Sequence, residues 1–172
     1  LDAAEVHGIA RSGATVAICT TTEANLGDGL FPLRDYLDAG GRWGVGSDSH
    51  ISVSPVEELR WLEYGQRLRA RRRNIASSLE SPSVGATLFA CAQASAAAST
   101  GFEVTDRLVL DGDAAILAGA TDADVLDRWI FSGNANGVRD VEVAGVRVVE
   151  GGRHRDREAV ASRYREAIRQ LA

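Results

Sequence analysis

The sequence predicts an α/β fold in which strands and helices alternate over the first part of the chain, followed by a smaller β-rich part. Two short apolar runs, at residues 14–19 and 43–46, have the length and composition of buried parallel strands. Helical patterns at residues 32–39 and 55–73 follow them. This alternation is typical of a (β/α)8 barrel or a doubly wound sheet. Because a complete barrel needs about 250 residues, 172 residues can hold only its last two or three βα units.

The helices of this first part have recognisable starts and stops. Asp2 is a candidate N-cap, and Gly13 and Gly101 are candidate C-terminal stops. Pro55 suits the first turn of a helix, and Glu57 and Glu58 in the same turn would offset the helix dipole. The expected helices cover residues 1–13, 32–39, 55–73 and 84–100, and a loop is expected at residues 20–31, which are rich in Thr, Asn, Gly and Asp.

The sequence changes character after Phe102, where short β-like runs and Gly-containing turns replace the longer helices. A tight hairpin is expected at residues 144–146. We therefore predict two domains, residues 1–101 and residues 102–172. The expected elements of the second are strands at 108–110, 114–117, 129–131, 141–144 and 146–149, a helical crossover at 121–128 and an amphipathic terminal helix at 156–172.

Composition narrows the class of partner and of chemistry. A formal net charge of -5 argues against a nucleic-acid or anionic-membrane surface as the main partner. Every basic residue among the 19 is arginine, so Schiff-base chemistry on lysine is excluded. Cys19 and Cys91 lie in apolar surroundings outside any Cys-x-x-Cys pair, as free thiols of a cytoplasmic protein would. No apolar run is long enough to span a membrane.

Candidate site residues follow the second predicted strand, in the segment Gly-Ser-Asp-Ser-His at residues 46–50. A carboxylate directly after a buried strand needs compensation, which a divalent metal or a helix N-terminus would provide. A metal-bound carboxylate can also accept a proton from metal-bound water. Asp48 fits that role, although a turn or cap is the commoner role of Asp in such a place. His50, two residues on, would be a ligand, a substrate contact or an ordinary loop histidine.

A second set of polar residues follows the first predicted strand, at residues 20–29. It offers threonine hydroxyls together with Glu23 and Asn25. The alternative is a structural βα turn in which Asn25 and Asp28 bond the local backbone, and composition alone favours that alternative.

Two stretches of the chain carry a specific resemblance. The run at residues 46–68, GSDSHISVSPVEELRWLEYGQRL, and the run at residues 21–29, TTEANLGDG, resemble the formimidoylglutamate deiminase family of the amidohydrolase superfamily. The likeness extends over nearly the whole chain, including residues 129–134 and 143–152. It implies the last βα units of a (β/α)8 metal-dependent hydrolase barrel at residues 1–101. Part of a small β-sandwich and a C-terminal helix would follow at residues 102–172.

The resemblance also implies a reaction. Enzymes of this family hydrolyse the formimino C=N bond of N-formimino-L-glutamate, giving N-formyl-L-glutamate and ammonia in histidine degradation, with one zinc ion that activates water. Iron would suit a site of one Asp and several histidines equally well. Asp48 matches the carboxylate that binds the metal and accepts the proton of its water. Glu23 and Asn25 match the loop that lines the substrate site, with His50 as a further candidate contact.

Several residues that the family requires are not matched in this chain. They are a His-x-His pair, two further metal-site histidines, a Glu and an arginine-containing site for the substrate carboxylate. The expected partner is therefore an N-terminal barrel segment of the same enzyme, within a possible homodimer. The alternatives are another amidohydrolase-superfamily deaminase, of guanine or adenosine type, and an inactive fragment.

Overall fold

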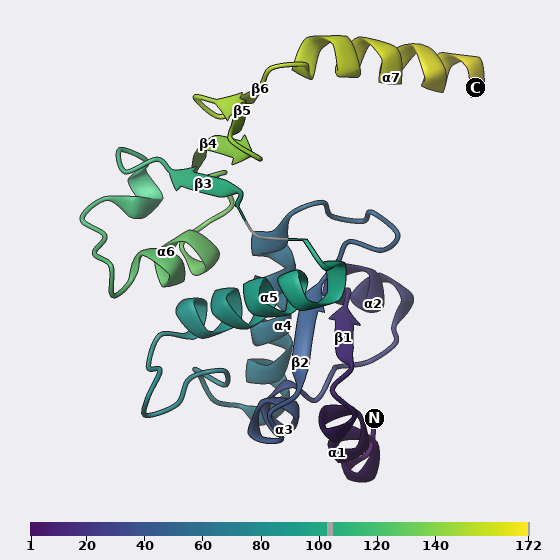
Figure 1. Cartoon of the computed structure of the whole chain (residues 1–172), viewed down its shortest axis with the longest axis vertical. Helices are drawn as coiled ribbons and strands as arrows, with labels where there is room; N and C mark the ends of the chain where they lie inside the picture. The colour runs from purple at the N-terminus through teal and green to yellow at the C-terminus, as the bar shows by residue number, and fades with distance from the viewer. Residues whose placement is uncertain (103–104, 172) are drawn as a thin grey trace. The chain divides into compact units, whose positions relative to one another are not determined.

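The structure, a computed structural model, describes residues 1–102 and 105–171 and divides into two compact units (Figure 1). Among the described residues, the first unit comprises 1–102 and 119–133, and the second comprises 105–118 and 134–171. Segment 119–133 packs with the first unit, where the Asp127 carboxylate accepts a hydrogen bond from the Gly85 amide at 2.7 Å. Within the described residues, no helix has the length and apolar content needed to cross a membrane.

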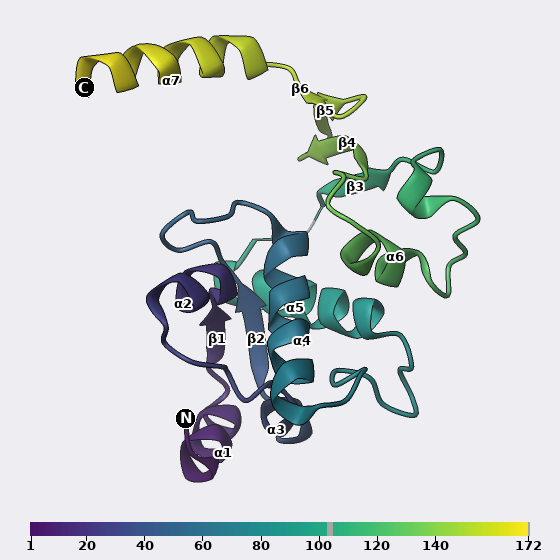
Figure 2. The ribbon, with the colours of Figure 1, turned by 180° about the vertical axis from the view of Figure 1, so that it is seen from behind.

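The first unit is built around two parallel strands, β1 (Thr15–Ile18) and β2 (Arg42–Val45). Their register pairs Thr15 with Arg42 and Ile18 with Val45. Helices α4 (Pro55–Ala70) and α5 (Val84–Thr100) pack against β2 (Figures 1 and 2). The other helices of this unit are α1 (Ala3–Ser12), α2 (Thr20–Leu26), α3 (Leu33–Asp38) and α6 (Val125–Phe131). The core between strands and helices includes Ile18, Leu33, Trp43, Leu62 and Leu88.

The helix boundaries follow the expected signals. Asp2 and Glu5 form a capping box at the start of α1, which ends at Gly13 in the left-handed region. Ser54 caps α4 ahead of Pro55, and α5 ends at Gly101, also left-handed. The predicted helices at residues 1–13, 32–39, 55–73 and 84–100 are confirmed, each within a few residues.

Three predicted elements were wrong. Residues 20–26 form helix α2 where a loop was expected, because the buried Glu58 carboxylate accepts a hydrogen bond from the Thr21 amide at the start of that helix. The predicted strand at 129–131 is the last turn of α6, because a short apolar run does not separate a strand from a buried helix segment. A 3-10 helix stands at Ala115–Leu117 instead of a strand.

The second unit is an antiparallel sheet in the order β3–β4–β5–β6. The predicted hairpin joins β4 and β5 through Ala144 and Gly145, with φ values of 48° and 78°. Helix α7 (Arg157–Leu171) follows the sheet and has no buried residue. The strands are β3 (Arg107–Leu110), β4 (Val138–Val143), β5 (Val146–Glu150) and β6 (Arg153–His154).

Candidate functional site

The carboxyl ends of β1 and β2 lie side by side, which brings the two predicted polar segments together. The strands are parallel neighbours, and the last link of their ladder is the Gly46 amide donating to the Ile18 carbonyl at 3.1 Å. The segment after β1 therefore starts beside the segment that carries Asp48. Active sites of βα folds are found at this end of the strands.

Asp48 lies in a backbone turn directly after β2. The His50 amide donates to the Ser47 carbonyl at 3.0 Å, and both Asp48 and His50 have left-handed backbones, with φ of 44° and 57°. Asp48 is exposed, and no hydrogen bond or ion pair of its side chain is found within residues 1–102 and 105–171. Its carboxylate thus does not cap the turn, and both oxygens are available to a ligand.

The hydroxyl of Thr22 connects α2 to this turn. It donates to the Ser47 carbonyl at 2.9 Å and accepts from the Ser49 amide at 3.2 Å. Thr22 is only 1% exposed, whereas Ser49 is exposed, so the two bonds join a buried side chain to a turn at the surface. The first polar segment therefore shapes the second one directly.

Glu58 of α4 is bonded to Thr21, the residue that precedes Thr22 on α2. It is 2% exposed, and its carboxylate accepts hydrogen bonds from both the amide and the hydroxyl of Thr21. The sequence alone predicts no more for Glu58 than a charge that offsets the α4 dipole. Its spacing of four residues from the buried Leu62 was the signal that Glu58 lies on the buried face of the helix.

The predicted substrate contacts Glu23, Asn25 and His50 have different surroundings. Glu23 is half-buried on α2, and one of its oxygens accepts the Cys19 amide at 2.8 Å. Asn25 is exposed on the same helix, and His50 is exposed in the Asp48 turn. In the described parts of the chain, no three His, Cys, Asp or Glu side chains converge on a point where a metal could be held.

The pKa of the Cys19 thiol reflects its burial and the negative charge near the carboxyl ends of β1 and β2. Burial raises the pKa of its thiol, and the nearby carboxylates of Asp48, Glu23 and Glu58 raise it further, in that order. The thiol is therefore protonated at neutral pH and is a poor nucleophile.

Asp48 fits one position of a metal site. A carboxylate oxygen is a suitable ligand for zinc, but zinc sites normally have at least three protein ligands. The described residues thus offer one candidate ligand, Asp48, and no group of three donors that could hold a metal.

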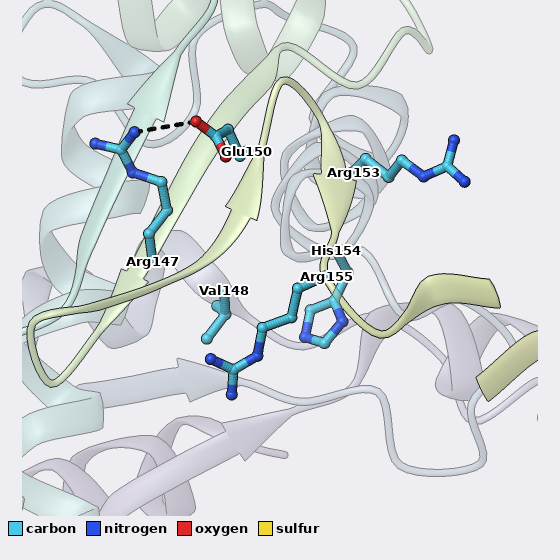
Figure 3. A pocket seen from close by; sticks show the side chains of 6 residues that line it. All are labelled: Arg147, Val148, Glu150, Arg153, His154 and Arg155. Atoms are coloured by element: carbon cyan, nitrogen blue, oxygen red, sulfur yellow. Dashed lines mark ion pairs between the residues drawn. The ribbon is translucent and has the colours of Figure 1, made fainter. Parts of the chain in front are cut away.

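The second unit contains a cavity of about 290 Å³ that is lined mainly by basic side chains (Figure 3). Arg147 pairs with Glu150 at 3.5 Å, and Arg153 pairs with Glu158 at 2.8 Å. Figure 3 shows the Arg153 side chain pointing away from Arg147. Arg155, which also lines the cavity, pairs with Asp156 at 3.6 Å. Because each of these guanidinium groups has a carboxylate partner, the cavity is not a candidate anion site. The residues lining it are Arg147, Val148, Glu150, Arg153, His154 and Arg155.

Comparisons with known proteins confirm the resemblance seen in the sequence. Formimidoylglutamate deiminase of Pseudomonas aeruginosa (strain PAO1) is 49% identical over 178 residues, which cover 99% of this chain and 39% of the relative. The crystal structure of an amidohydrolase from Brucella melitensis matches with a TM-score of 0.92 and 39% identity, over 99% of this chain and 39% of that one. No protein-family model matches the chain.

A more distant structure carries a metal. An adenosine deaminase from Xanthomonas campestris, solved with bound zinc, matches with a TM-score of 0.77 over 99% of this chain and 41% of that one. At 21% identity this likeness shows the fold alone. The α/β fold is thus shared with amidohydrolases, and the chain corresponds to a C-terminal portion of them, spanning about two-fifths of the length of these relatives.

Proposed function

We propose that this chain, related over 99% of its length to formimidoylglutamate deiminase, forms part of a metal-dependent enzyme of that activity. The enzyme would hydrolyse N-formimino-L-glutamate to N-formyl-L-glutamate and ammonia in histidine degradation. The observation that carries the proposal is the exposed Asp48 carboxylate at the carboxyl end of β2. It lies within the run at residues 46–68 that resembles this family.

Asp48 would hold one divalent cation, zinc or iron, and accept a proton at a carboxylate oxygen. The cation would supply Lewis acidity that lowers the pKa of water and stabilises negative charge on the reacting group. Asp48 suits proton transfer because its carboxylate is not bonded within the described residues. Glu23, Asn25 and His50 would line the substrate space beside it. Glu23 would do so with the oxygen that does not accept the Cys19 amide.

We further propose the architecture that completes the site. Residues 1–101 would be the last βα units of a (β/α)8 barrel, and residues 102–172 would be part of a β-sandwich with its closing helix. The remaining metal ligands and the substrate-carboxylate site would come from an N-terminal barrel segment of the same enzyme. A homodimer stays a prediction. The free thiols of Cys19 and Cys91 support a place in the cytoplasm.

The test is Asp48→Asn in the complete enzyme, with ammonia release from N-formimino-L-glutamate and bound metal both measured. We expect turnover to fall by at least about 100-fold, because a general base and a metal ligand are lost together. Asp38→Asn is the matched control, since it makes the same change at an exposed carboxylate on α3 that pairs with Arg34. Near-normal turnover in the Asp48 variant would refute the role assigned to Asp48.

The choice of substrate has its own test. The wild-type enzyme is offered N-formimino-L-glutamate, guanine and adenosine under the same conditions. We expect ammonia release from the first alone. Faster release from guanine or adenosine would replace the proposal by another deaminase activity of the superfamily.

A further inference from the structure

We infer that Thr22 is a positioning residue that holds the Asp48 carboxylate in its working direction, an inference that rests on the proposed function. Thr22 lies on α2, after β1, whereas Asp48 follows β2. A single side chain thus connects the two strand ends at which the site is proposed.

The hydroxyl of Thr22 bonds to the residue before Asp48 and to the residue after it. It donates to the carbonyl of Ser47 at 2.9 Å and accepts from the amide of Ser49 at 3.2 Å. These are the residues directly before and after Asp48 in the chain. The orientation of the Asp48 Cα–Cβ bond depends on the two peptide units that flank it, and Thr22 bonds to the residue on each side.

The turn needs such support because its backbone is unfavourable. Asp48 has a φ of 44° and His50 a φ of 57°, a region that costs residues other than glycine about 1 kcal/mol or more each. The Ser47 carbonyl accepts both the Thr22 hydroxyl and the His50 amide. Without the hydroxyl, only the bond between Ser47 and His50 would close the turn.

Burial and the bonding of its neighbour Thr21 both hold Thr22 in place. It is 1% exposed, so water does not compete for its hydroxyl. The preceding residue, Thr21, is bonded through its amide and its hydroxyl to the buried carboxylate of Glu58 on α4. The position of the Asp48 turn is thereby tied to α4 through α2.

The neighbouring Thr20 provides a control within the same helix. It is also buried, at 7% exposed, and its hydroxyl has no hydrogen-bond partner within the described residues. Thr20→Val and Thr22→Val make the same change two residues apart. Only the second removes bonds to the Asp48 turn.

The experiment compares Thr22→Val, Thr22→Ser and Thr20→Val in the complete enzyme. The readouts are zinc affinity by chelator competition, hydrogen exchange of a peptide containing residues 47–51, and kcat against KM. For Thr22→Val we expect zinc affinity to fall about 10- to 100-fold, as when hydrogen bonds that orient a metal ligand are removed. Exchange at residues 47–51 should be faster and kcat lower, with KM little changed. Thr22→Ser keeps the hydroxyl, so its zinc affinity, exchange rate and kcat should be close to those of the wild type. Thr20→Val should leave zinc affinity and exchange as in the wild type.

Unchanged zinc affinity in a folded Thr22→Val variant would overturn the inference, even if exchange at residues 47–51 became faster. The proposed function would still stand in that case, provided that Asp48→Asn loses zinc and activity. If Thr22→Val does not fold, the Ser49 amide of the wild type decides: slow exchange there supports the hydrogen bond to Thr22, and full exposure to exchange overturns it.

Discussion

Glu63 of α4 is fully buried, and its carboxylate is hydrogen-bonded to the chain segment that follows that helix. One oxygen accepts from the Ile75 amide and from Arg67 Nε, both at 2.8 Å, and the other accepts from the Ala76 amide at 3.1 Å. Arg67 also lies over the rings of Tyr64 and Phe131. The buried charge is thus compensated by three donors.

Glu63→Ala should lower the free energy of unfolding by about 2–4 kcal/mol, because two buried amides lose their acceptor and Arg67 loses its buried partner. Urea unfolding measures the change. The double variant Arg153→Ala with Glu158→Ala is the control, since it removes an exposed ion pair expected to contribute less than about 1 kcal/mol. Equal effects of the two variants would contradict the role given to Glu63.

Single residues differ in how far the sequence predicts them. Asp48 could be singled out because it directly follows a short apolar strand and lies in the run at residues 46–68 that resembles the deiminase family, whereas its place after the strand alone would favour an ordinary turn. The roles of Thr22, Glu58 and Glu63 could not, because apart from Arg67 their hydrogen-bond partners lie 12 to 37 positions away in the chain. The packing of α2 against α4 and the turn after β2 brings the partners of Thr22 and Glu58 within reach, and the return of the segment after α4 does so for Glu63.

Helices α5 and α6 approach each other through Gly85. A Cβ atom added there would lie 2.6 Å from the backbone of Leu126 and Asp127. The small residue therefore permits the contact through which the Gly85 amide reaches the Asp127 carboxylate.

Gly85→Ala should destabilise the first unit by about 1–3 kcal/mol, because backbone atoms cannot move aside as a side-chain tip can. Gly8→Ala is the matched control: no atom lies within 4 Å of the added Cβ, and Gly8 is an exposed residue inside α1. That change should stabilise by up to about 1 kcal/mol, the difference in helix propensity. Thermal unfolding monitored by circular dichroism checks both, and a stable Gly85→Ala protein would disprove the close approach.

Elements with strong local signals were predicted well. Helices α1, α4 and α5 have side-chain caps, and the hairpin between β4 and β5 has a Gly in its turn. Helix α2 was missed because Thr-rich sequence has low helix propensity and its start is stabilised by Glu58 from a distant helix. Helix α6 was predicted only in part: the expected helical crossover at 121–128 covers its first residues, and 129–131 were predicted as a strand because three apolar residues in a row fit a strand equally well.

At the scale of the molecule, the pattern of alternating strands and helices sufficed for an α/β fold, which the structure and its amidohydrolase neighbours confirm. The chain pattern alone could not separate a barrel from a doubly wound sheet, since two parallel strands occur in both. Nor could it place residues 119–133, which follow the change of sequence character but pack with the first unit.

The division into two units has a spectroscopic consequence. All three tryptophans, Trp43, Trp61 and Trp129, belong to the first unit, and Trp43 is fully buried on β2. Tryptophan fluorescence therefore does not monitor the sheet β3–β6 or α7 directly, whereas circular dichroism monitors the helices and strands of both units. If the units unfold separately, the two signals should give different urea midpoints, and the Glu63→Ala variant should shift the fluorescence midpoint. Superimposable curves would show one cooperative transition, and the fluorescence of this chain would then report on the whole molecule.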